Sequence, residues 1–376
     1  MKALKKLYIF LFVLFLNSIS ILQPYVTYRA KNLLKKSNQN DNLRVILQLK
    51  NNYSIDDLAN FFEKNNLNRK ERIKILFQYF EENKKNYQEF LNTIPTENIK
   101  DIQNLWFINS VVIEGQKNTL DKIIQNKKID FVDIDATLIS DKPESVKQIT
   151  NIETTATVPD NLKVVNANKL WQMGITGKGR LVLSVDTGVD VNHPALKQKW
   201  RGNKVPYSQA WYDPDFSSTF SDCDNHGTAT TGVMVGCDPN SGDTIGVAID
   251  AEWIAAKALC GNSALTSIVL NVFQWALNPD NDLNTDNDVP DVINCSFLDP
   301  DVTNECESIY ISALKALEAA DIAVIFSAGN SGPNSSTITK PKNINYDLVN
   351  SFCVGSIDHS KFLANDYNPI ASFSSR

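Results

Sequence analysis

Three polar residues stand next to predicted strands or helices, and their types suit acid–base chemistry. Asp186 ends the apolar run LVLSVD, His226 opens the small-residue run HGTATTGVMVG, and Asn330 follows the apolar run IFSAG. A carboxylate can orient an imidazole, a neutral imidazole can accept a proton, and an amide can donate to a developing oxyanion. The positive end of a helix should favour neutral His226, and we expect Gly232 to let that helix pack closely.

Taken singly, each residue also has a structural interpretation. A lone aspartate at a strand end commonly caps a turn, and a lone histidine is more often structural than catalytic. The tetrapeptide VDTG also occurs in aspartic proteases, but their chemistry needs a second Asp-Thr/Ser-Gly, which the sequence lacks. The glycines of GITGKG precede a strand rather than follow one, so they do not fit a dinucleotide-binding loop.

The hydrophobic pattern beyond residue 165 indicates the elements that must position these residues. Apolar runs typical of buried strands alternate with helical stretches, and this order predicts a doubly wound, mainly parallel α/β sheet. In such a sheet the chemistry gathers at the carboxyl ends of the strands. The predicted strands are 180–185, 253–259, 291–297, 322–327 and 352–357, and the predicted helices are 227–235, 265–277 and 305–320.

The part before residue 165 has a different pattern and predicts a small α+β domain over residues 40–140. Residues 141–164 are polar, without strong periodicity, and are interpreted as a linker in which the chain is cleaved. The predicted strands are 43–49, 105–114 and 129–136, and the predicted helices are 54–62 (opened by a capping box at Ser54), 69–91 and 119–125.

The first 28 residues have the pattern of a secretory signal peptide, a basic MKALKK followed by the apolar LYIFLFVLF. An uncleaved signal anchor is the alternative, because apolar residues continue beyond that run. We therefore expect export, with no stable membrane association after cleavage. Six cysteines are compatible with export but allow 15 pairings, and Cys295 and Cys353 are expected to be buried free thiols because they lie in apolar runs.

Composition and charge narrow the possible partners. The 376 residues are 43% hydrophobic with a formal net charge of −6, which argues against nucleic acid as a partner. The acidic stretch DNDLNTDND at 280–288 has the alternation of a calcium loop, but Thr285 stands where an EF-hand needs glycine. We interpret it as a solvated loop, assign no metal ligands and no cofactor, and leave a structural calcium ion unassigned.

Together, Asp186, His226 and Asn330 resemble the catalytic set of the subtilisin-like serine proteases (subtilases, peptidase family S8). The histidine follows the aspartate by 40 positions (226 − 186), and the asparagine follows the histidine by 104 (330 − 226). The motifs VDTGVD with NHPAL, NHGTATTGVMVG and SAGNSG all match, and WQMGITGKGRLVLSVDTGVDVNHPALKQKWRG looks like the bacillopeptidase F group. The resemblance covers residues 165–376, and the N-terminal domain is similar to the family's inhibitory propeptide.

The resemblance implies a role for each residue. Asp186 would orient His226, His226 would act as general base, and Asn330 would donate to the oxyanion. Three residues, Ser296, Phe297 and Leu298, would pair with the extended backbone of a protein or peptide substrate. Leu298 stands where the family often has glycine, so it would narrow the specificity pocket. The propeptide would act as an intramolecular inhibitor.

One part of the family's catalytic set is not among these residues. The family's nucleophile lies in a Gly-Thr-Ser turn, and no such turn occurs in the 46 residues (376 − 330) that follow Asn330. We therefore expect an incomplete peptidase domain that is inactive as it stands, belonging to a secreted serine endopeptidase. The alternative is a secreted, catalytically inert pseudoprotease that acts as a binding protein.

Overall fold

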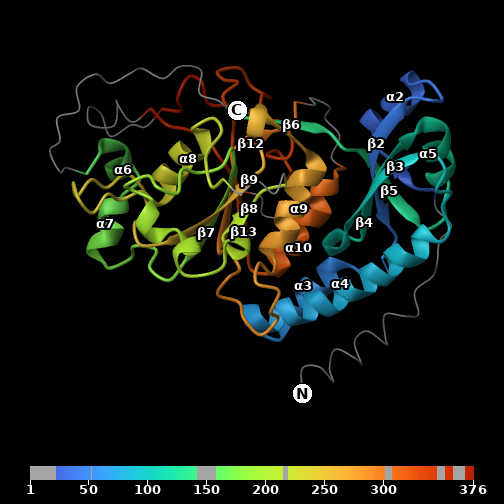
Figure 1. Ribbon diagram of the computed structural model, residues 1–376. Helices are drawn as coiled ribbons and strands as arrows, with labels where there is room; N and C mark the ends of the chain where they lie inside the picture. The colour runs from blue at the N-terminus through green and yellow to red at the C-terminus, as the bar shows by residue number, and fades with distance from the viewer. Residues whose placement is uncertain are drawn as a thin grey trace. The chain divides into compact units, whose positions relative to one another are not determined.

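The computed structural model describes residues 23–51, 53–141, 158–214, 219–300, 307–344, 352–358 and 369–376. The chain divides into two compact units (Figure 1). The first runs to Asp135 and includes Thr303–Ala320, and the second comprises Ala136–Val302 and Asp321–Arg376. Most of the predicted leader and linker lies outside the described residues. No helix within the described ranges is long and apolar enough to span a bilayer.

The first unit contains a five-stranded sheet in the order β1-β5-β2-β4-β3, antiparallel except for the β1–β5 pair. Its core includes Val45, Leu47, Val111 and Phe90, all of which are fully buried. The strands are β1 (Tyr25–Val26), β2 (Asn42–Leu49), β3 (Ile99–Leu105), β4 (Ser110–Gln116) and β5 (Ile129–Ile134), and the helices are α2 (Tyr28–Lys36), α3 (Ile55–Lys64), α4 (Arg69–Leu91) and α5 (Lys117–Ile123).

Several predictions for this unit need correction. The leader at residues 1–28 stays a prediction, and within it Tyr25–Val26 form β1 and Tyr28 begins α2. The predicted strand 105–114 contains a short 3-10 turn at Trp106–Ile108, before β4 begins. The capping box lies at Asn68 and Glu71, where α4 starts, whereas the Ser54 side chain caps α3 by accepting from the Asp56 amide.

A helix from a distant part of the sequence completes the first unit. Helix α10 (Ile309–Ala319) contacts α3. Gln48 Nε2 donates to Ser312 Oγ at 2.8 Å, and Lys315 Nζ pairs with Asp56 at 2.6 Å. The predicted domain limits therefore differ from the compact units, because α10 follows the strands of the second unit in sequence but packs within the first.

The second unit is built on a six-stranded sheet in the order β14-β13-β11-β7-β9-β8, in which every strand pair is parallel. The predicted parallel α/β architecture is confirmed. Its strands are β7 (Leu181–Asp186), β8 (Trp211–Tyr212), β9 (Glu252–Lys257), β11 (Val292–Cys295), β13 (Ala323–Ser327) and β14 (Phe352–Val354), and its helices are α6 (Asp160–Val164), α7 (Ala167–Gln172), α8 (His226–Val235) and α9 (Thr266–Ala276).

A second, small sheet lies in the same unit. Strand β6 (Thr137–Ser140) lies between β10 (Ser263–Leu265) and β12 (Phe297–Leu298) and is antiparallel to both (Figure 1). Strand β6 was not predicted from the sequence, because four residues that end in a polar stretch give too short a pattern. Its position matters because β12 belongs to the predicted substrate-binding segment.

Candidate active site

The structure brings Asp186 and His226 into direct contact. Asp186 ends β7 and is fully buried, and His226 is the first residue of α8. His226 Nδ1 lies 2.8 Å from Asp186 Oδ1, so the protonated Nδ1 donates to the carboxylate. The amide of Thr187 donates to the same oxygen at 2.7 Å, and Thr230 Oγ1 donates to the other at 3.0 Å. These bonds fix the carboxylate and, through it, the plane of the imidazole.

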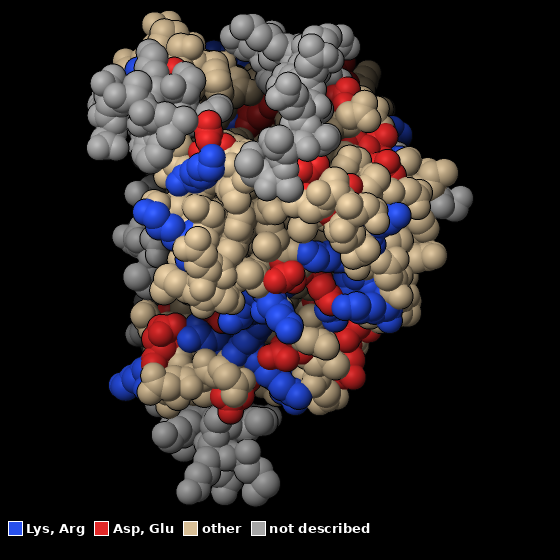
Figure 2. All heavy atoms as spheres, turned by 90° about the vertical axis from the view of Figure 1, so that its left-hand side faces the viewer, with Lys and Arg blue, Asp and Glu red and all other residues tan. Residues whose placement is uncertain are grey.

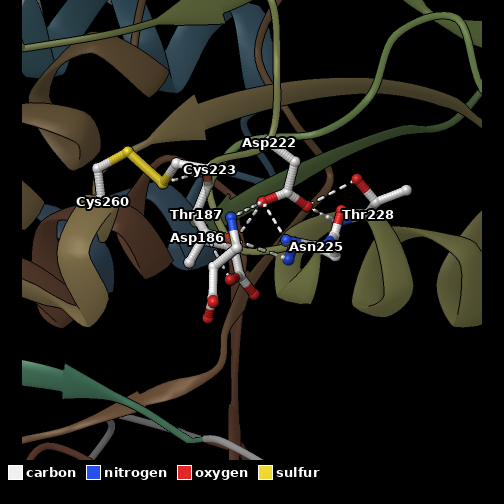
Figure 3. The surroundings of a disulfide bond; sticks show 9 residues. Asp186, Thr187, Asp222, Cys223, Asn225, Thr228 and Cys260 are labelled. Atoms are coloured by element: carbon white, nitrogen blue, oxygen red, sulfur yellow. Dashed lines mark hydrogen bonds between the residues drawn. A yellow bond between two sulfur atoms is a disulfide. The ribbon is translucent and has the colours of Figure 1, made fainter.

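Asp222 holds the loop that leads into α8. Figure 3 shows its carboxylate facing Thr187, Asn225 and Thr228. Thr187 Oγ1 donates to one oxygen at 2.7 Å, and the amide and hydroxyl of Thr228 donate to the other at 2.7 and 2.6 Å. Burial opposes ionisation of Asp222, but these hydrogen bonds outweigh it and lower its pKa. The charged carboxylate thus caps the helix that carries His226, and it was not predicted because its partners come from two segments.

Close backbone contact between α8 and the turn after β7 fixes how near His226 comes to Asp186. A Cβ added at Gly227 would lie 2.0 Å from the carbonyl oxygen of Gly188. Gly188 itself has φ +98°, and a Cβ there would lie 2.5 Å from the carbonyl oxygen of Ser221. The predicted role of Gly232 is wrong, because a Cβ there would have no atom within 4 Å. Gly227 is the helix glycine that permits the approach.

The protonation of His226 differs from the expectation based on the helix end. The hydrogen bond to Asp186 raises the pKa of His226 above its ordinary value of 6.5, although burial opposes this. The charge of Asp186 and a backbone bond to Asp141 act in the same direction. The carboxylate is charged and in contact, so it outweighs the partial charge of the helix terminus.

Strand β6 lies along the residues that we predicted to bind substrate. Ser140 is opposite Phe297 and Ile139 is opposite Leu298 in an antiparallel register. The amide of Asp141 donates to the carbonyl oxygen of Ser296 at 3.1 Å. The Phe297 side chain is fully buried against Phe326, with ring centroids 6.0 Å apart, so its backbone alone contributes to the pairing. All three predicted residues therefore contact an extended chain segment.

The carbonyl group of Asp141, which directly follows β6, contacts His226 and Asn330. Its oxygen lies 3.1 Å from His226 Nε2 and accepts a hydrogen bond from Asn330 Nδ2 at 3.3 Å. His226 and Asn330 thus meet at one peptide carbonyl just after β6, and Asp186 contacts the other ring nitrogen of His226. The next residue, at 142, lies outside the described part of the chain.

The side chain of Asp141 enters a polar pocket that was not predicted from the sequence. Its Oδ2 accepts hydrogen bonds from Ser327 Oγ, at the end of β13, and from Lys342 Nζ. The side chains of Asp141 and Lys342 are 4% and 1% exposed, so this is a buried ion pair. The described polar contacts to this side chain come from these two residues. Lys342 gave no signal in the sequence, since it lies in an irregular segment.

A disulfide bond supports the loop before α8. Cys223 is bonded to Cys260, which joins the Asp222 loop to the segment after β9 (Figure 3). Cys295 on β11 is a buried free thiol, as predicted, whereas Cys353 on β14 is exposed, contrary to the prediction. The rest of β14 is exposed as well, since Phe352 and Val354 are 51% and 56% exposed.

The acidic loop at 280–288 uses its carboxylates for local contacts. Asp280 accepts from Thr285 Oγ1 at 2.7 Å, and Asp288 accepts from the Asp280 amide at 3.0 Å. No group of three or more His, Cys, Asp or Glu residues suited to a metal ion occurs in the part that the structure describes.

Figure 2 shows basic side chains with acidic neighbours on one face, and in the second unit Arg201 and Lys204 both pair with Glu252.

Comparison with known proteins identifies the family. Residues 177–376 match the model of the subtilase family. The chain belongs to the subtilases. It is 33% identical to bacillopeptidase F of Bacillus subtilis over 310 residues, which is 76% of this chain and 21% of that protein. It is 28% identical to subtilisin E of the same organism over 58% of this chain and 49% of that protein. This subtilase chain thus spans less than two thirds of the length of these relatives.

The fold has a solved counterpart as well. The structure of fervidolysin from Fervidobacterium pennivorans, a keratinolytic enzyme related to subtilisin, superposes with a TM-score of 0.57 at 16% identity. The match covers 94% of this chain and 47% of that one. At this level of identity the likeness establishes the fold, and it agrees with the subtilisin-like architecture that the motifs predicted.

Proposed function

We propose that this subtilase chain belongs to a serine endopeptidase that binds extended peptides between β10 and β12, where β6 lies. The main support is the position of the Asp141 carbonyl oxygen, which lies within 3.3 Å of both His226 Nε2 and Asn330 Nδ2. A peptide carbonyl held between a base and an amide donor has the surroundings that acyl transfer requires. Antiparallel pairing with β10 and β12 recognises the backbone, so substrates of varied sequence can bind in the same way.

In the proposed reaction a serine hydroxyl attacks the peptide carbonyl carbon, and His226 removes the hydroxyl proton. Asn330 donates to the oxyanion of the tetrahedral intermediate, and the imidazolium of His226 is stabilised by Asp186. Collapse of the intermediate breaks the C–N bond, and the leaving amine takes the proton from His226. Water then hydrolyses the acyl-enzyme by the same steps. The 376 residues contain no Gly-Thr-Ser turn after Asn330, so the proposal takes this serine from the whole protein.

The chain up to Asp141 is proposed to act as an inhibitory propeptide whose last strand, β6, fills the substrate site. In support, β6 pairs with strands on both sides, and the Asp141 carbonyl contacts the proposed base and oxyanion donor. Cleavage would then break the peptide bond after Asp141, at the start of the predicted linker. Substrates would compete with β6 for the same strand positions.

Export is proposed from the leader pattern and from the Cys223–Cys260 disulfide, because disulfides persist in oxidising compartments. Among the relatives, the minor extracellular protease Vpr of Bacillus subtilis is 31% identical over 48% of this chain, and its name places it outside the cell. Finding the native protein in the culture medium, without the predicted leader at residues 1–28, would support export. Retention of that segment in a membrane fraction would support the signal anchor instead.

A fluorophosphonate probe on the native, full-length protein tests the proposed peptidase. We expect it to label a serine, and labelling should fall strongly in the Asp186→Asn variant. The same variant should lose about 10⁴ in kcat, and Asn330→Ala should lose about 10²–10³, a range measured in subtilisin itself. Lys169→Ala, a change on the remote helix α7, serves as the control.

The pseudoprotease alternative gives the opposite result in the same experiment. A natural stop codon directly after the codon for Arg376, together with no labelling, would contradict the peptidase and leave a binding protein. An in-frame Gly-Thr-Ser turn further along, together with labelling, would support the peptidase.

A further inference from the structure

We infer that the pocket around the Asp141 side chain makes this subtilase selective for aspartate immediately before the cleaved bond, with Lys342 as the residue that sets the preference. This inference rests on the proposed function, because it treats β6 as a bound substrate segment. Lys342 Nζ pairs with Asp141 Oδ2, and Ser327 Oγ donates to the same oxygen. The pocket thus offers one cation and one hydroxyl donor at the depth that an aspartate side chain reaches.

Burial makes this pairing selective. The Lys342 side chain is 1% exposed, and burial lowers its pKa below the ordinary 10.5, while the Asp141 carboxylate partly opposes that shift. Within the described part of the chain, Asp141 provides the ion pair of Lys342. An apolar side chain in place of Asp141 would leave a buried ammonium group without its counter-ion, which is far more costly than losing a surface pair.

The shape of the pocket favours a short acidic side chain. Gly329, at φ +103°, lies beside it: a Cβ there would be 3.1 Å from Lys342 Nζ and 3.8 Å from Asp141 Oδ1. The Asp141 side chain reaches both of its donors, so the extra methylene of glutamate must be accommodated by displacing one of them. A change of one methylene in a shaped pocket alters kcat/KM by about 10-fold or more.

The backbone around Asp141 supports its assignment as the residue before the cleaved bond. Its amide donates to Ser296 O at 3.1 Å, and its carbonyl oxygen accepts from Asn330. The residue is therefore held at both backbone groups while its side chain enters the pocket. Thr137–Ser140 of β6 would occupy the four preceding positions of a substrate.

Peptides that copy the β6 sequence test the preference with the native, full-length enzyme. The probes are fluorogenic peptides Thr-Leu-Ile-Ser-Xaa-Lys, with Asp, Glu, Asn, Leu or Lys as Xaa. We expect kcat/KM for Asp to exceed that for Asn and Leu by about 100-fold or more, with Glu between them. In Lys342→Met the order of Asp and Leu should reverse, and Lys342→Arg should restore the acidic preference in part.

The matched control is Lys340→Met, which removes another buried lysine from the same segment. Its preference for Asp should remain. Fluorophosphonate labelling of each variant shows whether the active site is formed, so misfolding is not mistaken for lost specificity. If the enzyme is labelled but cleaves the Leu peptide as well as the Asp peptide, the specificity inference is wrong and the proposed function stands.

Absence of labelling in the native enzyme would instead overturn the proposed function, and a second measurement then tests the pocket by itself. In the 376-residue chain, hydrogen exchange at the β6 amides reports how firmly the segment is held. We expect Asp141→Asn and Lys342→Met each to accelerate exchange by about 100-fold, with the double variant no faster than either single one. Unchanged exchange in both single variants would show that the pair does not hold the segment.

Discussion

Both ring nitrogens of His226 face oxygen acceptors, Asp186 Oδ1 at 2.8 Å and the Asp141 carbonyl at 3.1 Å. A neutral imidazole has one N–H and can satisfy only one of them, whereas the imidazolium satisfies both. Docking of β6 therefore favours the protonated form, which agrees with the raised pKa of His226. The protonated imidazole cannot accept a proton, so the docked segment would also suppress the role of His226 as base in the proposed reaction.

The docking of β6 should consequently weaken as pH rises. The hydrogen bond to Asp186 raises the pKa of His226, and the Asp141 carbonyl of docked β6 acts in the same direction. Protonation of His226 therefore favours docking, and this contribution is lost as the pH increases through the raised pKa. Hydrogen-exchange protection of the β6 amides, corrected for intrinsic rates, should therefore fall as the pH rises through the raised pKa of His226. His226→Gln should flatten this slope while leaving the Asp141–Lys342 pair in place. Protection that is constant or rises with pH in the unmodified chain would contradict the argument.

At the residue scale, sequence predicted the groups whose signals are local. Asp186, His226 and Asn330 each lie at the end or start of an element with a clear hydrophobic pattern. Lys342 and Asp222 were missed because their partners are brought together only by the fold. The narrowing of the specificity pocket by Leu298 stays a prediction, and the structure shows Leu298 opposite Ile139 in the β6–β12 pair.

At the scale of elements, the N-terminus of α8 is the most constrained junction in the site. Gly227→Ala would place a Cβ 2.0 Å from the Gly188 carbonyl oxygen, whereas Gly232→Ala meets nothing within 4 Å. We expect Gly227→Ala to lower the free energy of unfolding by about 1–3 kcal/mol. Gly232→Ala in the same helix should raise it by about 0.5–1 kcal/mol. Urea unfolding of the two variants measures both free energies. Equal changes in the two variants would show that the close contact at Gly227 is relieved without strain.

Long, strongly periodic elements were predicted well, and short ones were not. Helix α4 has the limits that were predicted for it, Arg69 to Leu91, because its apolar face repeats over many turns. Strands β6 and β12, with four and two residues, derive their hydrogen bonds from segments far away in sequence. A period of two cannot be recognised over so few residues.

At the scale of the whole molecule, compact units and sequence segments do not coincide. Helix α10 packs within the first unit although it is flanked in sequence by strands of the second, and β6 lies in the second although it ends the predicted propeptide domain. The predicted domain limits lie at changes of composition, which report local polarity. Contacts between distant segments leave no such change, so these exchanges could not be predicted.

The disulfide should contribute measurably to the stability of the second unit. Cys223 and Cys260 enclose a segment with a sequence separation of 37. Cross-linking a loop of this size restricts the unfolded chain, and its loss typically costs about 2–4 kcal/mol. The Cys223→Ser, Cys260→Ser double variant should therefore unfold at lower urea concentration, as followed by circular dichroism. Cys237→Ser, which alters a half-buried free thiol, is the control and should change the midpoint little.

Strand β6 has neighbours on both edges, and this should affect how slowly the strand leaves the proposed substrate site. A segment at the edge of a sheet can peel away one hydrogen bond after another, but a central strand must break two ladders together. If the bond after Asp141 is cut, as proposed, the new chain end would remain in place until both ladders open. Activation would then lag behind cleavage. The delay is the time between the appearance of the new amino terminus and the appearance of peptidase activity. The time between cleavage and activity would thus depend on how long the four residues of β6 stay paired.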